Sequence, residues 1–262
     1  NAVVKLECVY KFTFSNLKTK KMRAVIEKAH KKKSVGLDER SDEKKVDGKR
    51  VKAEFENFII KEDHPCLMAQ TVFSMDKVDL HVYDNFGSKN TAINILKDLK
   101  KYISNYDFES NEFFTFMAVF KGRKSFTEDQ FEELLWKQLN FLHEVDTEGW
   151  DPAVSSDPSN KDFSFSLGGR AFYMVGLHPN SSRLARQAPY PTIAFNLHWQ
   201  FEKLREMGTY EVVRDKIRDR DTELQGDINP MLQDFGENSE ARQYSGRKVG
   251  DEWKCPFLSG KM

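Results

Sequence analysis

The chain has 262 residues, enough to bury a substantial core in one large domain or two small ones. Hydrophobic residues make up 39% and charged residues 31%, as in ordinary globular proteins. The 41 basic side chains balance 41 acidic ones, which excludes a global field that would attract nucleic acid or an anionic membrane.

The first fifth of the chain is the most charged part. Residues 3–14 alternate loosely and predict a strand, and residues 16–33 predict a strongly basic helix. Residues 34–50 contain glycines among many charges and predict a linker. We therefore expect a basic N-terminal extension and linker over residues 1–50, and a single domain over residues 51–262.

More regular patterns begin at residue 51. Residues 55–62 predict a short amphipathic helix, and residues 90–103 predict a longer one. Between these helices, residues 69–75 and 78–83 resemble two strands separated by a turn. Residues 113–120 are apolar enough to predict a buried strand.

Residues 125–146 give the clearest helix pattern. Thr127 and Gln130 form a capping box, in which each side chain satisfies a backbone donor at the start of the helix. One apolar stripe then follows, made of Phe131, Leu134, Leu135, Gln138, Leu139, Leu142 and Val145. Trp136 and His143 are seven residues apart, so they share one edge of this stripe.

A hairpin follows a loop of turn-forming residues. Residues 163–167 and 170–177 predict two strands joined by Gly168-Gly169, and residues 192–196 predict another strand. Residues 181–187 predict a helical turn, and two helices are predicted over residues 199–207 and 211–224. Hairpin strands beside helices indicate an α+β fold, a mainly antiparallel sheet with flanking helices.

The histidines and one cysteine are the first candidates for chemistry, because nucleotide-binding, hydrolase and zinc signatures are absent from the sequence. A rigid helix that presents His143 beside Trp136 suits axial ligation of a haem iron. His178 and His198 each follow a strand, where functional loops begin. Cys255 precedes a proline, as some haem-ligating thiolates do. By residue type alone, a structural role is favoured for each of these residues.

Arginines and amides are frequent after residue 170. Planar guanidinium groups bind carboxylates through two hydrogen bonds, which fits haem propionates or an amino-acid substrate. The alternative is an ion-pair network with acidic residues such as Asp221 and Glu240. Arg183 and Arg186 are the arginines we select for anionic groups, and both interpretations stay open at this point.

Several long motifs in the second half resemble those of the YqcI/YcgG family over about residues 51–257. The first run comprises Trp150-Asp151-Pro152, Ser155-x-Asp157-Pro158 and Phe163-Ser164-Phe165-x-x-Gly168-Gly169-x-Ala171-Phe172. The second comprises Gly176-Leu177-His178-Pro179-Asn180-Ser181-Ser182-Arg183-x-x-Arg186 and Phe195-Asn196-x-His198-x-Gln200-Phe201-Glu202. The third comprises Arg218-x-Arg220-Asp221, Leu224-Gln225-Gly226 and Asn229-Pro230-Met231-Leu232-x-Asp234-Phe235-Gly236. The last comprises Ser239-Glu240-Ala241-Arg242-Gln243-Tyr244-Ser245-Gly246-Arg247 and Trp253-x-Cys255-Pro256-Phe257.

This resemblance implies a haem-dependent oxygenase that hydroxylates a guanidine or amine nitrogen of an arginine-like substrate, with O2 or peroxide as oxidant. It implies haem b as cofactor and His143 as the iron ligand. Trp136, His178, Arg183, Arg186, His198 and Cys255 are the other residues expected to contact the cofactor. Glu240 and Asn196 are the expected catalytic residues, because a buried guanidinium needs a carboxylate partner.

Two other functions are weighed against this one. A haem carrier or sensor without turnover would fill both axial positions with protein, for instance His143 with Cys255 or His178. A nucleic-acid-binding module would use the basic helix, although zero net charge and the solvated-face interpretation count against it. The three widely spaced cysteines and the absence of long apolar runs predict a cytoplasmic protein without membrane contact, and a homodimer is left open.

Overall fold

The computed structural model describes residues 48–122 and 126–257, which lie in one compact unit. The predicted strand over residues 3–14, the basic helix over 16–33 and the linker up to residue 47 lie outside these ranges. The predicted linker is too long at its end, because residues 48–50 already form the first turn of helix α3 (Gly48–Glu56).

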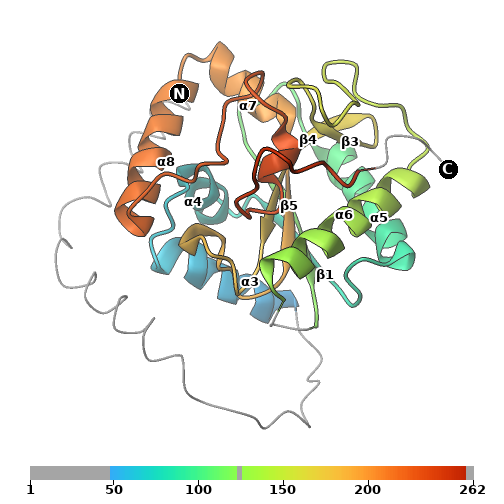
Figure 1. Cartoon of the computed structure of the whole chain (residues 1–262), viewed down its shortest axis with the longest axis horizontal. Helices are drawn as coiled ribbons and strands as arrows, with labels where there is room; N and C mark the ends of the chain where they lie inside the picture. The colour runs from blue at the N-terminus through green and yellow to red at the C-terminus, as the bar shows by residue number, and fades with distance from the viewer. Residues whose placement is uncertain (1–47, 123–125, 258–262) are drawn as a thin grey trace, which may run out of the picture. The chain divides into compact units, whose positions relative to one another are not determined.

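A five-stranded sheet in the order β1-β2-β5-β4-β3 forms the centre of the domain (Figure 1). The strands are β1 (Val78–Tyr83), β2 (Thr115–Phe120), β3 (Phe165–Leu167), β4 (Arg170–Leu177) and β5 (Thr192–Leu197). The β2–β5, β5–β4 and β4–β3 pairings are antiparallel, which confirms the α+β class and the mainly antiparallel sheet. The β1–β2 pair is parallel, so the sheet is mixed. Helix α5 (Lys89–Asn105) provides the crossover that a parallel pair requires.

Helices α5 and α6 (Glu128–Val145) cover one face of the sheet. The predicted capping box is present, since Thr127 Oγ1 accepts the Gln130 backbone N–H and the Gln130 side chain accepts the Thr127 N–H. The predicted stripe of α6 is also confirmed, with Phe131, Leu135 and Leu139 fully buried against the sheet. This apolar cluster fixes the helix over β3 and β4.

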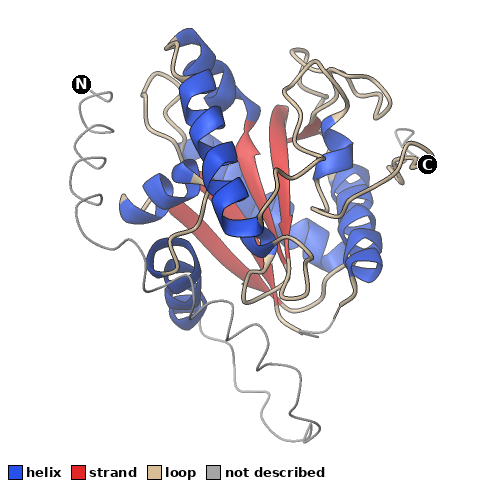
Figure 2. Ribbon diagram, turned by 60° about the vertical axis from the view of Figure 1, so that its left-hand side comes forward, coloured by secondary structure: helices blue, strands red, loops and turns tan. Residues whose placement is uncertain are grey.

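Helix α3, the π-helical turn η1 (Asn57–Lys61) and α4 (Leu67–Ser74) cover the other face, so that the strands lie between helices on both sides (Figure 2). The strand predicted over residues 69–75 is wrong, because this segment is α4. Cys66 caps the helix by accepting the Ala69 N–H at Sγ, and the neighbouring side chains of Val72 and Phe73 both become buried. A short apolar run fits a strand or a buried helix equally well, and here the packing partners decide.

The C-terminal part combines two helices with an irregular segment. Turn η2 (Leu184–Arg186) lies within the predicted residues 181–187 and precedes β5. Strand β5 leads directly into α7 (His198–Glu206) and then α8 (Tyr210–Gln225), whose ends lie within one residue of the prediction. After α8, residues 226–257 contain only the short helix η3 (Glu240–Gln243) and cross between α8 and α6 (Figure 1). None of the helices described in 48–122 and 126–257 has both the length and the apolar character needed to span a bilayer.

Candidate functional site: buried polar groups at the free edge of β4

One edge of β4 is only partly covered by another strand. The short strand β3 pairs with Arg170, Ala171 and Phe172, whereas β5 runs along the whole opposite edge. Farther along the free edge, the Gly176 N–H donates to the Tyr244 carbonyl at 2.7 Å and the Gly176 carbonyl accepts from Arg186 Nη1 at 2.9 Å. Segments from η2 and η3 therefore take the place of a pairing strand.

The close approach at Gly176 explains why this position carries no side chain. A Cβ atom added there would lie 2.6 Å from the Tyr244 carbonyl oxygen and 2.8 Å from side-chain atoms of Leu135 and Phe131. The backbone of η3 can thus reach the sheet edge only at a glycine. This contact positions the polar residues of η3 inside the protein.

Glu240 is a buried carboxylate of this region. The side chain is 4% exposed, its Oε2 accepts from the Tyr244 hydroxyl at 3.3 Å, and its Oε1 lies 3.9 Å from His198 Nδ1. Across the described residues no Lys or Arg forms an ion pair with it. Burial raises the pKa of Glu240 to about 8, so the carboxyl is largely protonated at neutral pH.

His198 faces Glu240 from the first turn of α7. Its Nε2 lies 3.3 Å from Glu202 Oε1, and the ring makes an edge contact with Phe235 at 4.4 Å between centroids. Burial lowers the pKa of His198, and the neighbouring Glu202 carboxylate opposes that shift. The imidazole and the Glu240 carboxyl therefore form a buried pair that is close to uncharged at neutral pH.

His178 lies at the other end of β4, where it follows the strand as the sequence indicates. It is 1% exposed, and its ring stacks on Phe131 at 4.5 Å between centroids. Its Nδ1 is buried and has no hydrogen-bond partner within the part of the chain that the structure describes. Burial also lowers the pKa of His178, which keeps the imidazole neutral and able to act as a ligand.

Arg186 lies beside His178, and the backbone N–H of His178 donates to the backbone carbonyl of Arg186 at 3.0 Å. The Arg186 guanidinium is buried and donates to the Gly176 carbonyl, but it forms no ion pair with a carboxylate of the described residues. Burial accordingly lowers the pKa of Arg186. A buried guanidinium in this state gains strongly from an anionic group of a ligand.

Arg183, selected together with Arg186 from the sequence, is already compensated. Its guanidinium donates to Asp221 Oδ2 at 2.6 Å, to a carboxylate oxygen of Asp227 and to the Asp227 carbonyl. These bonds tie the loop after β4 to the end of α8. Arg186, and not Arg183, is therefore the arginine left for an anionic ligand.

Asn196, predicted as catalytic, connects strands in the structure. Its Oδ1 accepts from the Thr115 hydroxyl at 2.9 Å and its Nδ2 donates to the Tyr173 carbonyl at 3.4 Å. These contacts join β2, β5 and β4. They give Asn196 a structural role that the residue type alone does not reveal.

His143, Trp136 and Cys255 form a second group, along α6 and the C-terminal segment. The His143 ring makes edge contacts with Phe257 at 5.1 Å and Trp150 at 5.8 Å between centroids. Trp136 stacks on Tyr244, and Cys255 packs against the same apolar cluster, where burial raises the pKa of its thiol to about 12. Cys255 is thus a thiol at neutral pH, and ligation of iron would require the loss of its proton.

The two groups are well separated along α6. His178 stacks on Phe131 at the start of the helix, whereas His143 lies twelve residues later, which corresponds to about 18 Å along the helix axis. The structure therefore brings His178 together with Arg186, and Glu240 together with His198, and it places His143 away from His178 along α6.

Several residues of the site do not stand out in the sequence. Tyr173 donates its hydroxyl to Gln243 Oε1 at 2.8 Å, and Glu132 of α6 accepts from Ser245, Arg247 and Trp253. Glu132 holds the C-terminal segment against α6. The only sequence signal for it is an acidic residue next to an apolar stripe, which is normally solvent-exposed.

Known proteins resemble the chain over most of this domain. The sequence model of the YqcI/YcgG family matches residues 55–258. The chain belongs to the YqcI/YcgG family. The residues that build the free edge of β4, from Gly176 to Tyr244, all lie inside the matched region.

The YqcI/YcgG chain is similar to the uncharacterized protein YcgG of Bacillus subtilis (strain 168), with 23% identity over 206 residues that cover 74% of this chain and 80% of the relative. No solved structure matches the chain significantly.

Proposed function

We propose that this protein is a cytoplasmic haem-dependent oxygenase that hydroxylates a guanidine or amine nitrogen of a small arginine-like substrate, with O2 or peroxide as oxidant. The proposal starts from the resemblance to N-hydroxylating YqcI/YcgG proteins. The structural observation that carries it is Glu240, a buried carboxyl that forms no ion pair with Lys or Arg in the described ranges. Such a group suits a cationic substrate.

The residues of the β4 edge fit haem b in their chemistry. His178 offers a buried, neutral imidazole whose Nδ1 lacks a partner among the described residues, and the adjacent Arg186 offers a guanidinium that suits a propionate. In the ranges 48–122 and 126–257, no cluster of three or more His, Cys, Asp or Glu side chains could hold a bare metal ion. Haem iron needs only one or two protein ligands, so it does not require such a cluster. Haem, when bound, supplies the oxidative chemistry.

The protein's own groups would bind the substrate and move a proton. A guanidinium that approaches Glu240 stabilises the ionised carboxylate, so Glu240 loses the proton that burial keeps on it. The Tyr244 hydroxyl, 3.3 Å from Oε2, holds the carboxyl in place. The His198 imidazole, 3.9 Å from Oε1, stays neutral because burial lowers its pKa, so the released proton passes to solvent.

An absorption spectrum of protein produced with ample haem precursor tests the cofactor. We expect a Soret band that is lost or shifted in His178→Ala, since Nδ1 of His178 is buried without a hydrogen-bond partner among the described residues and Arg186 lies beside this residue. His143→Ala tests the ligand predicted from the sequence, and His81→Ala, on β1, is the control that should leave the band unchanged. A band lost only in His143→Ala would return the ligand to His143. A folded protein without a Soret band would overturn the proposal.

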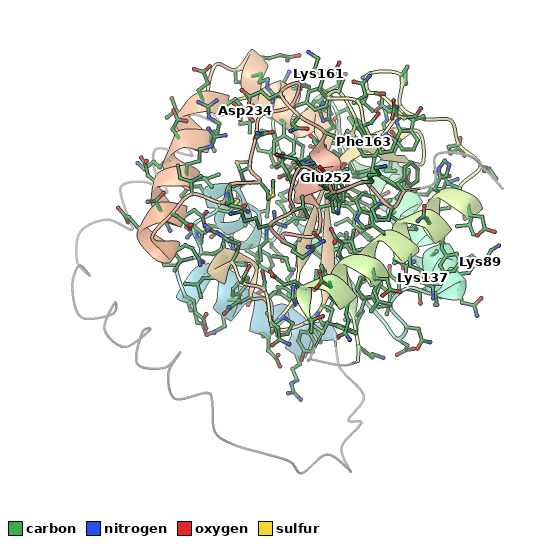
Figure 3. All side chains as sticks on the ribbon, in the orientation of Figure 1. Lys89, Lys137, Lys161, Phe163, Asp234 and Glu252 are labelled. Atoms are coloured by element: carbon green, nitrogen blue, oxygen red, sulfur yellow. The ribbon has the colours of Figure 1, made fainter. Side chains whose placement is uncertain are left out.

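Substrate binding tests Glu240 separately. We expect arginine affinity to rise with pH up to about 8 and then to level off, because binding requires loss of the Glu240 proton. Glu240→Gln should weaken binding about ten- to a hundredfold and abolish the pH dependence, with the Soret band retained. Glu252→Gln, in an exposed turn (Figure 3), is the matched control. Equal affinity of the Glu240→Gln variant would exclude this role.

The competing function is a haem carrier or sensor without turnover, and one observation favours a specific form of it. Cys255 and Phe257 lie in the same short segment, and Phe257 contacts His143. His143 with Cys255 is therefore the ligand pair open to a carrier, since His143 and His178 lie too far apart for one iron. A six-coordinate spectrum that does not respond to substrate would support the carrier.

A further inference from the structure

Strand β1 lies at one end of the sheet, and its outer edge faces away from β2. The parallel ladder with β2 starts where the Thr115 N–H donates to the Lys77 carbonyl at 3.1 Å. Because backbone groups alternate sides along a strand, the odd-numbered residues of β1 bond to β2. The N–H and carbonyl groups of Val78, Leu80 and Val82 therefore point to the outer edge.

This outer edge has no pairing segment in the part of the chain that the structure describes. Across residues 48–122 and 126–257, no other group bonds to the backbone of Val78, Leu80 or Val82 on this side. Proteins commonly block such an edge with a proline or a β-bulge, and β1 has neither. The edge is therefore able to accept another strand.

The sequence of β1 is self-complementary when two copies lie antiparallel. With Leu80 opposite Leu80 of a second copy, Val78 faces Val82 and Asp79 faces His81. The three apolar residues are then the hydrogen-bonded positions, as the direction of their backbone groups requires. Asp79 and His81 occupy the other positions, where facing side chains approach most closely. Backbone, apolar and charged groups thus select the same register.

Asp79 and His81 are available for contacts with a second copy. Their side chains are 44% and 34% exposed, on the side of the sheet that α5 covers. The hydrogen bond to Asp79 raises the pKa of His81 against burial, with further support from Asp98 and slight opposition from Lys101. The imidazole is therefore mainly cationic at pH 6, and each copy offers one cation and one anion at matching positions.

We propose that two copies of the chain associate through the outer edges of β1, in an antiparallel pairing that is centred on Leu80 and joins their sheets. Six backbone hydrogen bonds result, two for each of the three facing pairs among Val78, Leu80 and Val82. The interface is small, so we expect a dissociation constant on the order of 10–100 µM, and a monomer at lower concentrations. This surface goes beyond the proposed oxygenase function and contains none of the residues assigned to haem or substrate.

Sedimentation equilibrium of the full chain at pH 6, from about 1 to about 500 µM, tests the association. Leu80→Lys places two like charges opposite each other and should weaken the dimer about tenfold or more. Val212→Lys adds the same charge on α8, where the side chain is 69% exposed, and should leave the dimer unchanged. Circular dichroism shows that both variants are folded. A monomer at every concentration, or equal association of folded Leu80→Lys, would overturn the proposal.

A charge exchange tests the register. Asp79→Lys and His81→Asp each place like charges opposite each other across the interface, and each should weaken the dimer about three- to tenfold. The double variant restores opposite charges and should recover most of the affinity. Structural damage from the single substitutions would not be repaired in this way. A double variant that associates no better than either single variant would overturn the proposed pairing.

Amide hydrogen exchange measured by NMR tests the edge directly. The amides that bond to β2, such as those of Asp79 and His81, should be protected at every protein concentration. The amides of Leu80 and Val82 should become protected only as the concentration rises through the dissociation constant. Protection of these two amides at all concentrations would show that the same chain covers the edge, and it would overturn the proposal.

Discussion

The face of the sheet under α6 and the free edge of β4 are closed by different forces. Under α6, fully buried side chains such as Phe131, Leu135 and Leu139 fill the space between helix and sheet. At the β4 edge, buried polar groups such as Glu240, His198 and Arg186 are held by directional bonds to η3 and β4. Apolar packing tolerates no cavity, whereas buried polar groups reduce stability unless a partner completes them. The α6 face therefore stabilises the fold, whereas the β4 edge contains buried polar groups that a ligand could bind.

Truncation under α6 should have the largest effect on stability. Leu139→Ala removes a side chain that is 0% exposed, and we expect a loss of about 3–4 kcal/mol in the free energy of unfolding at any pH. Urea denaturation followed by circular dichroism measures it. Ile93→Ala on α5, where the side chain is 50% exposed, is the control and should change the free energy by less than about 1 kcal/mol. Similar losses in both variants would contradict the apolar role of this face.

Gly176→Ala should disturb the β4 edge almost as strongly. The new Cβ meets a backbone oxygen, that of Tyr244, which cannot move without shifting η3, so we expect a loss of about 2–3 kcal/mol. Gly149→Ala is the control, because no atom lies within 4 Å of its Cβ position. Urea denaturation curves of the two variants measure this loss. An unchanged midpoint for Gly176→Ala would show that the Tyr244 carbonyl does not pack against Gly176.

The pH dependence of stability should separate the edge from the α6 face. The pKa of Glu240 is about 8 in the folded protein and ordinary in the unfolded chain, so the folded state binds the extra proton between these values. Its contribution is fully present below the unfolded pKa and is lost as the pH rises through the folded pKa.

We therefore expect the free energy of unfolding to fall by about 2 kcal/mol between pH 5 and pH 7, at up to about 1.4 kcal/mol for each pH unit. Glu240→Gln should flatten this slope, whereas Leu139→Ala should shift the whole curve without changing its shape. Parallel curves for the parent protein and Glu240→Gln would show that Glu240 is not the titrating group.

His81 should give the smallest effect, because its carboxylate partners are solvated. Its Nε2 lies 2.9 Å from Asp79 and its Nδ1 3.5 Å from Asp98, and the hydrogen bond to Asp79 raises the pKa of His81, against burial. Lys101 opposes the shift slightly, and Tyr83 and Phe116 flank the ring.

The raised pKa means that His81 stabilises the fold below about pH 6.5 and that this contribution disappears as the pH rises through the folded value. Solvent screening limits it to under about 1 kcal/mol. His81→Gln should therefore lose stability at pH 5 but hardly at pH 9, as thermal denaturation at the two pH values would show. A larger loss at pH 9 would reverse the assignment.

Local patterns predicted the parts of this protein whose structure depends on neighbouring residues in the chain. The capping box of Thr127 and Gln130, the stripe of α6 and the Gly168-Gly169 hairpin all form as the sequence indicates. Each rests on hydrogen bonds or periodicity within a few residues. The helix α4 was missed, because eight residues with apolar character fit a strand or a helix until Val72 and Phe73 meet their partners.

The candidate site was only partly predictable. The sequence singled out His178, Arg186, His198 and Glu240, and all four are buried along β4 and the segments beside it. It gave no reason to separate Arg183 from Arg186, three residues apart, although Asp221 and Asp227 compensate only the first. Those carboxylates lie about forty residues farther along the chain, at a distance that no local pattern encodes.

The sequence by itself thus determined the class of fold, the main helix, the hairpin and the family. The tertiary structure decided which polar groups are left without partners. Helix capping and hydrophobic periodicity depend on residues a few positions apart, so they can be recognised in the sequence. The burial of Glu240, the seating of Gly176 against Tyr244 and the isolation of Arg186 depend on long-range contacts, which exist only after the C-terminal segment closes over the free edge of β4.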